Sequence, residues 1–160
     1  MMRPLVLAFV CAGALAVPAT AAAEVAISLE AKKRVQTKDM LDRSSVKLVD
    51  PGTAIPGDEI VYSVKLANKG QTPAEKIRFV TPIPAELAYW AGSAAGGDAE
   101  AAFSIDGGQT FDRPDRLFKT DASGKKRLAE AWEYTHIQWR LPTPLPAAQV
   151  RTVTFHAVVR

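Results

Sequence analysis

The sequence predicts an all-β protein built as an antiparallel β-sandwich, and three observations support this prediction. Apolar residues recur at every second position along most of the chain, which is the pattern of strands with one buried face. The strand-like segments are short and follow one another at intervals of about 8–12 residues, with turn-forming residues between them. No segment combines a helical period with caps, and residues 128–132 could form at most one helical turn.

The expected strands follow the alternation in chain order. The segment with the clearest alternation places Ile60, Tyr62, Val64 and Leu66 on one face. One domain is expected, an immunoglobulin-like β-sandwich over residues 46–160. The N-terminal strand and its lead-in, at 24–45, precede it. The predicted strands are 25–31, 45–49, 60–67, 76–81, 87–91, 101–105, 135–141 and 153–159, with Phe111 and 117–118 continuing the sheet.

The first 23 residues have the pattern of a cleaved secretory signal peptide. Arg3 precedes an apolar run over residues 5–17, and small residues end the segment at 21–23. The apolar run is shorter than the roughly 20 residues of a transmembrane helix, so we expect cleavage rather than a retained anchor. Cleavage is expected after Ala23 or, alternatively, after Ala21. The mature chain is then exported, to the periplasm or the extracellular space, without a membrane anchor.

Composition and motifs argue against several classes of function. The single cysteine, Cys11, lies in the removed segment, so disulfides and thiol chemistry are not expected in the mature chain. The net charge is only +3, and the basic clusters at 32–34 and 125–127 are short, as in solvated turns, so nucleic-acid binding is not expected. No nucleophile elbow, phosphate loop or zinc-helix motif occurs. We therefore expect neither catalysis nor a cofactor.

Two turn motifs flank the clearest strand, and we interpret both as structural. Pro56, Gly57 and Asp58 precede it, and the aspartate carboxylate can accept hydrogen bonds from backbone amides. Asn68 and Gly70 follow it and are suited to a left-handed turn.

A third motif, Asp106-Gly107-Gly108, resembles the Asp-box hairpin known from sialidase propellers. We expect Asp106 to accept backbone amide hydrogen bonds while both glycines take positive φ. The mature chain, 137 residues after removal of 23 from 160, is too short for a multi-blade propeller. A hairpin turn is thus predicted here, and a ligand or calcium site is the alternative.

A series of motifs follows one another in a fixed order along the chain. They are Pro56-Gly57-Asp58, Ile60-Val61-Tyr62-Ser63-Val64, Asn68-Lys69-Gly70, Pro73-Ala74, Ile77, Pro82-Ile83-Pro84, Tyr89, Gly92-Ser93, Trp139 and the closing strand 150–159. Their order resembles a known family, the bacterial envelope repeat called domain of unknown function eleven. The resemblance covers about residues 46–160 and implies an immunoglobulin-like fold in a cell-envelope setting. Members of that family share no catalytic residues, so none is carried over to this chain.

The two histidines are candidate metal ligands. If the last two predicted strands form an antiparallel hairpin that aligns Ile137 with Phe155, His136 and His156 lie directly opposite each other. Cross-strand neighbours have Cβ atoms about 4.5–5.5 Å apart, close enough to share a metal ion. No third ligand is evident, and a register shift of two residues would separate them. An exposed pair without a function is the alternative.

Trp90 and Trp132 are candidates for contact with a glycan or a partner protein, because both flank predicted strands instead of alternating with the core. The leading hypothesis is a non-catalytic exported envelope protein that binds an envelope protein or a surface polymer. Two routes fit a sandwich: addition of a partner strand to an exposed edge, or presentation of loops from one end. Metal binding and glycan binding are the alternatives.

Overall fold

A computed structural model describes residues 23–38 and 43–160 of the protein, and it confirms an all-β fold with antiparallel sheets. The expected signal peptide, apart from Ala23, lies outside the described residues. Two short 3-10 helices accompany the strands. In chain order the elements are β1 (Val25–Lys38), β2 (Ser44–Val49), β3 (Glu59–Asn68), β4 (Arg78–Pro82), β5 (Leu87–Tyr89), β6 (Glu100–Ser104), η1 (Pro114–Arg116), β7 (Phe118–Thr120), β8 (Lys126–Leu128), η2 (Ala131–Glu133), β9 (His136–Arg140) and β10 (Val150–Val159).

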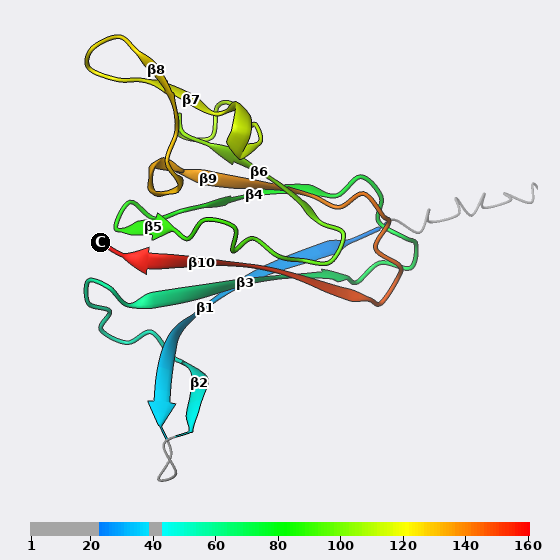
Figure 1. Cartoon of the computed structure of the whole chain (residues 1–160). Coiled ribbons are helices and arrows are strands. Elements are labelled where there is room, and N and C mark those ends of the chain that lie inside the picture. Colours follow the sequence, from blue (N-terminus) through cyan, green and yellow to red (C-terminus); the bar gives the residue numbers. More distant parts are fainter. Residues whose placement is uncertain (1–22, 39–42) are drawn as a thin grey trace, which may run out of the picture.

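Two sheets of unequal width form the sandwich (Figure 1). The wider sheet has the strand order β2-β1-β3-β10-β5, and the narrower sheet has the order β4-β9-β6. The alternation of apolar residues directs one face of each sheet toward the other. Leu66, Trp139 and Phe155, from β3, β9 and β10, are completely buried between them. Burial of a large apolar side chain stabilises the fold by about 1.5–3 kcal/mol.

The long central strands match the sequence prediction, since β3, β9 and β10 coincide with the most regular alternation. The possible helical turn at 128–132 is present as the 3-10 turn η2. Two expectations were wrong. β7 does not continue a large sheet but pairs only with β8, and β1 is seven residues longer than the predicted strand 25–31.

The connection between β9 and β10 passes from one sheet to the other. Leu145 is buried and exchanges two backbone hydrogen bonds with Ala74, at N–O distances of 2.8 and 2.9 Å. The amide of Asn68 then donates to the carbonyl of Gln149 at 3.0 Å, which places the following strand beside β3. Segment 141–149 is therefore a crossover, and β9 and β10 are not a hairpin.

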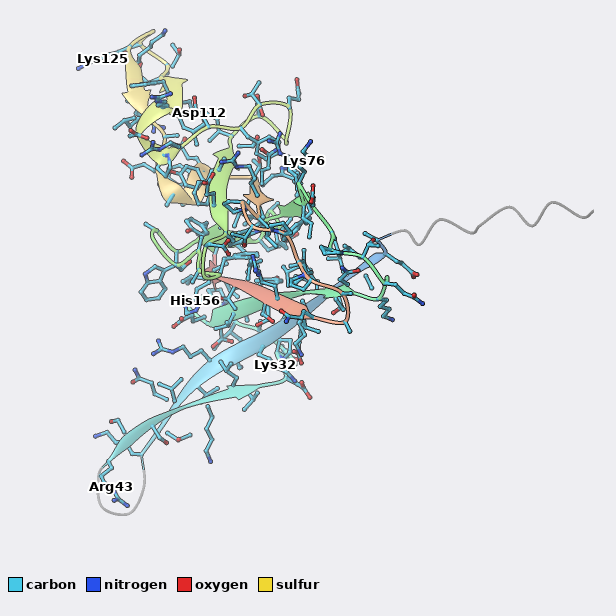
Figure 2. All side chains as sticks on the ribbon, turned by 90° about the vertical axis from the view of Figure 1, so that its right-hand side faces the viewer. Lys32, Arg43, Lys76, Asp112, Lys125 and His156 are labelled. Carbon is cyan, nitrogen blue, oxygen red and sulfur yellow. The ribbon has the colours of Figure 1, made fainter. Side chains whose placement is uncertain are left out.

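Two hairpins extend beyond the sandwich, on opposite sides of it. β1 continues past the start of β3, and its second half pairs with β2, from Lys33 opposite Val49 to Lys38 opposite Ser44. β7 and β8 project beyond the narrower sheet (Figure 1). In Figure 2, Arg43 and Lys125 lie toward the far ends of these two hairpins.

Candidate functional site

The turn before β3 has the backbone hydrogen bonds that were expected of it. The Asp58 carboxylate accepts a hydrogen bond from the Ile55 amide at 2.9 Å and pairs with the Lys33 ammonium at 3.2 Å. The Ile55 bond is the main reason that the pKa of Asp58 lies below its ordinary value. Gly57 has a φ of 92°, and its amide donates to the Val159 carbonyl at 2.9 Å. The turn at Pro56 thereby joins the start of β3 to the end of β10.

Asn68 stabilises the turn after β3 by a different route from the one predicted. Neither Asn68 nor Gly70 has a positive φ, so the expected left-handed turn is wrong. The Asn68 side chain is instead buried, and its Nδ2 donates to the carbonyls of Thr72 at 2.8 Å and Leu145 at 2.9 Å. Its Oδ1 accepts from the Gly70 amide at 3.0 Å. The side chain therefore links this turn to the crossover.

The Asp106 motif forms the predicted turn. Gly107 and Gly108 have φ values of 77° and 86°. The Asp106 carboxylate accepts hydrogen bonds from the Ser104 hydroxyl at 2.7 Å and from the Thr110 hydroxyl and amide at 2.5 and 3.0 Å. These bonds, that of Ser104 first, hold the pKa of Asp106 well below its usual range. The carboxylate is thus engaged by its own loop.

The prediction that the two histidines lie opposite each other is wrong, because β9 and β10 belong to different sheets. His136 and His156 alternate with buried residues of their strands and so lie on the outer faces of opposite sheets, with the core between them. His136 Nδ1 lies 3.1 Å from the Thr135 hydroxyl, and His156 Nδ1 lies 2.7 Å from a carboxylate oxygen of Glu59. Within the described residues, no three His, Cys, Asp or Glu side chains are placed to hold a metal ion.

Both candidate tryptophans are partly exposed to solvent. Trp90 is 50% exposed and Trp132 is 52% exposed. The guanidinium of Arg160 lies 5.9 Å from the centre of the Trp132 ring and also donates to the Trp132 carbonyl. Trp132 lines a shallow hollow with residues of the 83–87 and 133–136 segments, which Trp90 does not reach. The structure thus separates the two rings.

An exposed apolar strip on β1 was not anticipated by the sequence. Ile27 and Leu29 lie opposite Leu66 and Val64 of β3 and share their inward face. Leu66 and Val64 are at most 2% exposed, whereas Ile27 is 52% and Leu29 is 54% exposed. The narrower sheet does not reach β1, so this part of the inward face remains uncovered. We call Ile27 and Leu29 the β1 strip.

The strand edge beside the β1 strip is also unpaired. β2 pairs with β1 only from Lys33 onward, so residues 25–32 have β3 as their one neighbouring strand in the described part of the chain. An antiparallel strand directs alternate backbone N–H and C=O groups to each side. The edge at 25–32 therefore presents unused backbone donors and acceptors next to an apolar surface.

A buried carboxylate, also missed from the sequence, ties the β7–β8 hairpin to the sandwich. The Glu133 side chain is 3% exposed, and it pairs with Arg127 at 2.6 and 2.8 Å and with Lys119 at 2.8 Å. Its Oε2 accepts from the Glu130 amide at 2.9 Å. These cations, Arg127 first, hold the pKa of Glu133 well below its usual range. The Glu133 carboxylate already accepts four hydrogen bonds from these groups, so we interpret its role as structural.

A set of arginines on the outer face of the narrower sheet was likewise missed. Arg78 and Arg140 stand opposite each other on β4 and β9, and Arg113 approaches from the loop before η1 to line the same cavity. The spacing of Arg140 from buried Trp139 indicated its outward direction, but the pairing of β4 with β9 could not be read from the sequence.

Comparison with known proteins found no match to a family model, to a curated protein or to a solved structure. No helix in the described part of the chain is long and apolar enough to cross a membrane. Among the surfaces described, the β1 strip with its unpaired edge combines apolar exposure with free backbone groups, and it is the candidate site.

Proposed function

We propose that the protein is a non-catalytic exported module of the cell envelope, which binds a protein partner by strand addition along β1. The observation that carries this proposal is the β1 strip: two large apolar side chains on the inward face are more than half exposed beside an unpaired strand edge. Strand addition uses main-chain hydrogen bonds for affinity and alternate side chains for specificity.

The edge has the length and composition that an added strand requires. The open edge of β1 spans eight residues, 25–32. Strands of about 5–6 residues are typical of globular proteins, so the edge is long enough for an added strand. Residues 25–29 carry no charge, and the first charged side chain is that of Glu30. Proteins commonly protect edge strands with inward charges, proline or a covering loop. The absence of charge from 25–29 favours a surface that is covered by a partner.

The chemistry of the partner follows from this surface. A segment that adds to β1 must be extended and must place apolar side chains at every second position, beside Ile27 and Leu29. The outward side chains of the same strand would remain in solvent. The partner is therefore a protein with an extended, alternately apolar segment, either from an envelope protein or from a surface-exposed tail.

Capture of partners from crosslinked cell envelopes tests the proposal. The mature chain is compared with Leu29→Asp and with the matched control Val80→Asp, whose wild-type side chain is 45% exposed on the outer face of β4. We expect a protein that is retained by the wild type and by Val80→Asp but reduced about tenfold or more with Leu29→Asp. Equal recovery of every protein by the three baits would contradict strand addition at β1.

Export is a separate part of the proposal and has its own support and test. Residues 1–23 have the signal-peptide pattern. Glu24, the next residue, is already joined to the sandwich, because the Lys69 amide donates to its carbonyl at 2.7 Å. When the whole sequence is expressed in a bacterial host, we expect a periplasmic or secreted chain that begins at Glu24 or, with the alternative cleavage, at Ala22. A full-length chain confined to the cytoplasm would contradict export. The proposed setting in an envelope rests on the order of motifs that resembles the domain of unknown function eleven family, although no family model matches the chain.

Glycan binding remains a second candidate, because Trp90 and Trp132 are each about half exposed. Exposed aromatic rings stack on sugar rings, and the fluorescence of these tryptophans would then change on binding. Titration with a panel of envelope oligosaccharides is expected to quench emission in the wild type and less in Trp132→Ala. Unchanged emission across the panel would remove this candidate.

A further inference from the structure

The outer face of the narrower sheet carries a cavity with an unusual set of charges. Its volume is about 580 Å³, within the range of small-molecule sites. A second hollow of about 230 Å³ shares Arg78 and Arg140 with it and extends to Lys76. We call the two together the basic groove. Its lining includes Lys76, Arg78, Glu100, Ala101, Ala102, Arg113, Gln138 and Arg140.

Positive charge exceeds negative charge in the basic groove. Four cations line it, and Glu100 is the one carboxylate in its lining. Glu100 pairs with Arg140, at 2.8 Å from its Nη2 and 3.0 Å from its Nε. Arg113 Nε lies 3.7 Å from Asp115, and both of those side chains are more than two thirds exposed, so this pair is weak.

Arg78 and Lys76 make no ion pair with any described residue, so they supply uncompensated charge. The backbone of Lys76 adopts a φ of 52°, a left-handed conformation that favours glycine, although the residue carries a long cationic side chain. Backbone strain of this kind tends to persist at functional positions.

The strand register brings the arginines together at a cost to folding. Arg78 lies directly opposite Arg140, which in turn lies opposite Glu100 on β6. Like charges placed directly across a strand pair are destabilising. The single carboxylate neutralises one guanidinium and leaves the other beside it unmatched. An anion bound to Arg78 would offset this repulsion.

Guanidinium groups match oxyanions in geometry as well as in charge. A planar guanidinium donates two parallel N–H bonds to one carboxylate or phosphate group. Arg78 and Arg113 approach the cavity from different segments. The small side chain of Ala102, which stands opposite Gln138 on the outer face, leaves room for a ligand above the sheet. The Gln138 amide adds a neutral donor and acceptor to the same lining.

We propose that the basic groove binds a ligand that carries at least two oxyanion groups, carboxylate or phosphate. One group is held by Arg78 and Arg113 in the larger cavity, and a second is placed toward Lys76 in the adjoining hollow. The ligand is either a small polyvalent acid or a repeating acidic unit of a polymer, since both present the same chemistry. This proposal is independent of strand addition, because β1 contributes nothing to the groove.

Titration calorimetry at low ionic strength tests the proposal with three probes: citrate, inorganic phosphate and a galacturonate trimer. The wild type is compared with Arg78→Gln, Arg113→Gln and Arg116→Gln. Arg116 is an exposed arginine of η1 that lies outside the groove lining. Its substitution makes the same change in net charge but leaves the groove intact, so it is the control. Circular dichroism verifies that each variant is folded. Arg78→Lys, which retains the charge without the fork, provides a further comparison.

We expect saturable binding of citrate or of the trimer, at least about tenfold weaker in Arg78→Gln and Arg113→Gln and unchanged in Arg116→Gln. Tighter binding of citrate than of the trimer identifies a small acid as the ligand source, and the reverse order identifies a polymer. Arg78→Lys is expected to lie between the wild type and Arg78→Gln. The proposal is overturned if no probe binds, if Arg116→Gln loses as much affinity as Arg78→Gln, or if phosphate binds as tightly as both larger probes.

Discussion

Single buried polar side chains set the turns of this sandwich, and Asn68 is the clearest case. It makes three hydrogen bonds to the backbone at a position that is 1% exposed. Asn68→Ala removes these three bonds, and only the Leu145 carbonyl keeps another partner, the Ala74 amide, so we expect a loss of about 2–3 kcal/mol in the free energy of unfolding. Urea denaturation measures this loss. Gln71→Ala, at an exposed position of the same turn, serves as the control, and an equal effect there would contradict the assigned role.

Asp106 makes stability depend on pH through the same kind of turn. Its native pKa lies below the ordinary value, because the ionised carboxylate accepts hydrogen bonds from Ser104 and Thr110. The unfolded chain therefore takes up the proton first as pH falls, and the stabilisation that is present near neutral pH is lost in acid. Asp106→Asn is thus expected to be less stable than the wild type near pH 7.

The difference between the two proteins should narrow as the pH falls below about 4. Urea denaturation midpoints of both proteins are measured across this pH range. The difference between the wild type and Asp106→Asn at each pH cancels the contributions of the other carboxylates to the pH dependence of stability. A gap that stays constant from neutral to acid pH would show that the ionised Asp106 carboxylate does not stabilise the turn.

At the scale of elements, substitutions in β1 and β3 test whether the narrower sheet leaves part of the wider sheet uncovered. Ile27 and Leu66 stand opposite each other on one face, yet they are 52% and 0% exposed. Leu66→Ala creates a cavity in the core and is expected to cost about 2–5 kcal/mol, whereas Ile27→Ala should cost less than about 1 kcal/mol. Thermal and urea unfolding give both values. Similar costs at the two positions would mean that the strip is covered in solution.

The β7–β8 hairpin depends on one carboxylate. Glu133→Gln removes the charge that pairs with Arg127 and Lys119, and we expect a loss of about 2 kcal/mol together with faster amide exchange in β7 and β8. Lys125→Gln, at the exposed tip of the hairpin, is the control. Hydrogen exchange measured by mass spectrometry compares the protection of β7 and β8 in the two variants. Unchanged protection of the hairpin in Glu133→Gln would contradict its anchoring role.

For the whole molecule, the alternation of residues predicts which face of each strand is buried but not which strand lies next to it. Ile137 and Phe155 were correctly expected to face inward, since both are completely buried. Their alignment on neighbouring strands was wrong, because Leu145 inserts into the core and turns the connection into a crossover. The histidine pair failed for the same reason.

The candidate site depends on information of the same long-range kind. The alternation at 25–31 indicates an apolar face on β1, but whether that face is covered depends on the width of the opposite sheet, which no local pattern encodes. The basic groove likewise requires the pairing of β4, β9 and β6 before Arg78, Arg140 and Glu100 can be placed in one row. The turn at Asp106, in contrast, is local, and its sequence was sufficient to predict it.

Residue-resolved hydrogen exchange in β1 tests strand addition most directly. In the free protein, alternate amides between residues 25 and 32 should exchange rapidly, because they face the open edge, while their neighbours are protected by β3. With the captured partner bound, the rapidly exchanging amides should become protected. Exchange in β1 that is unchanged in the complex would contradict strand addition and place the partner elsewhere on the sandwich.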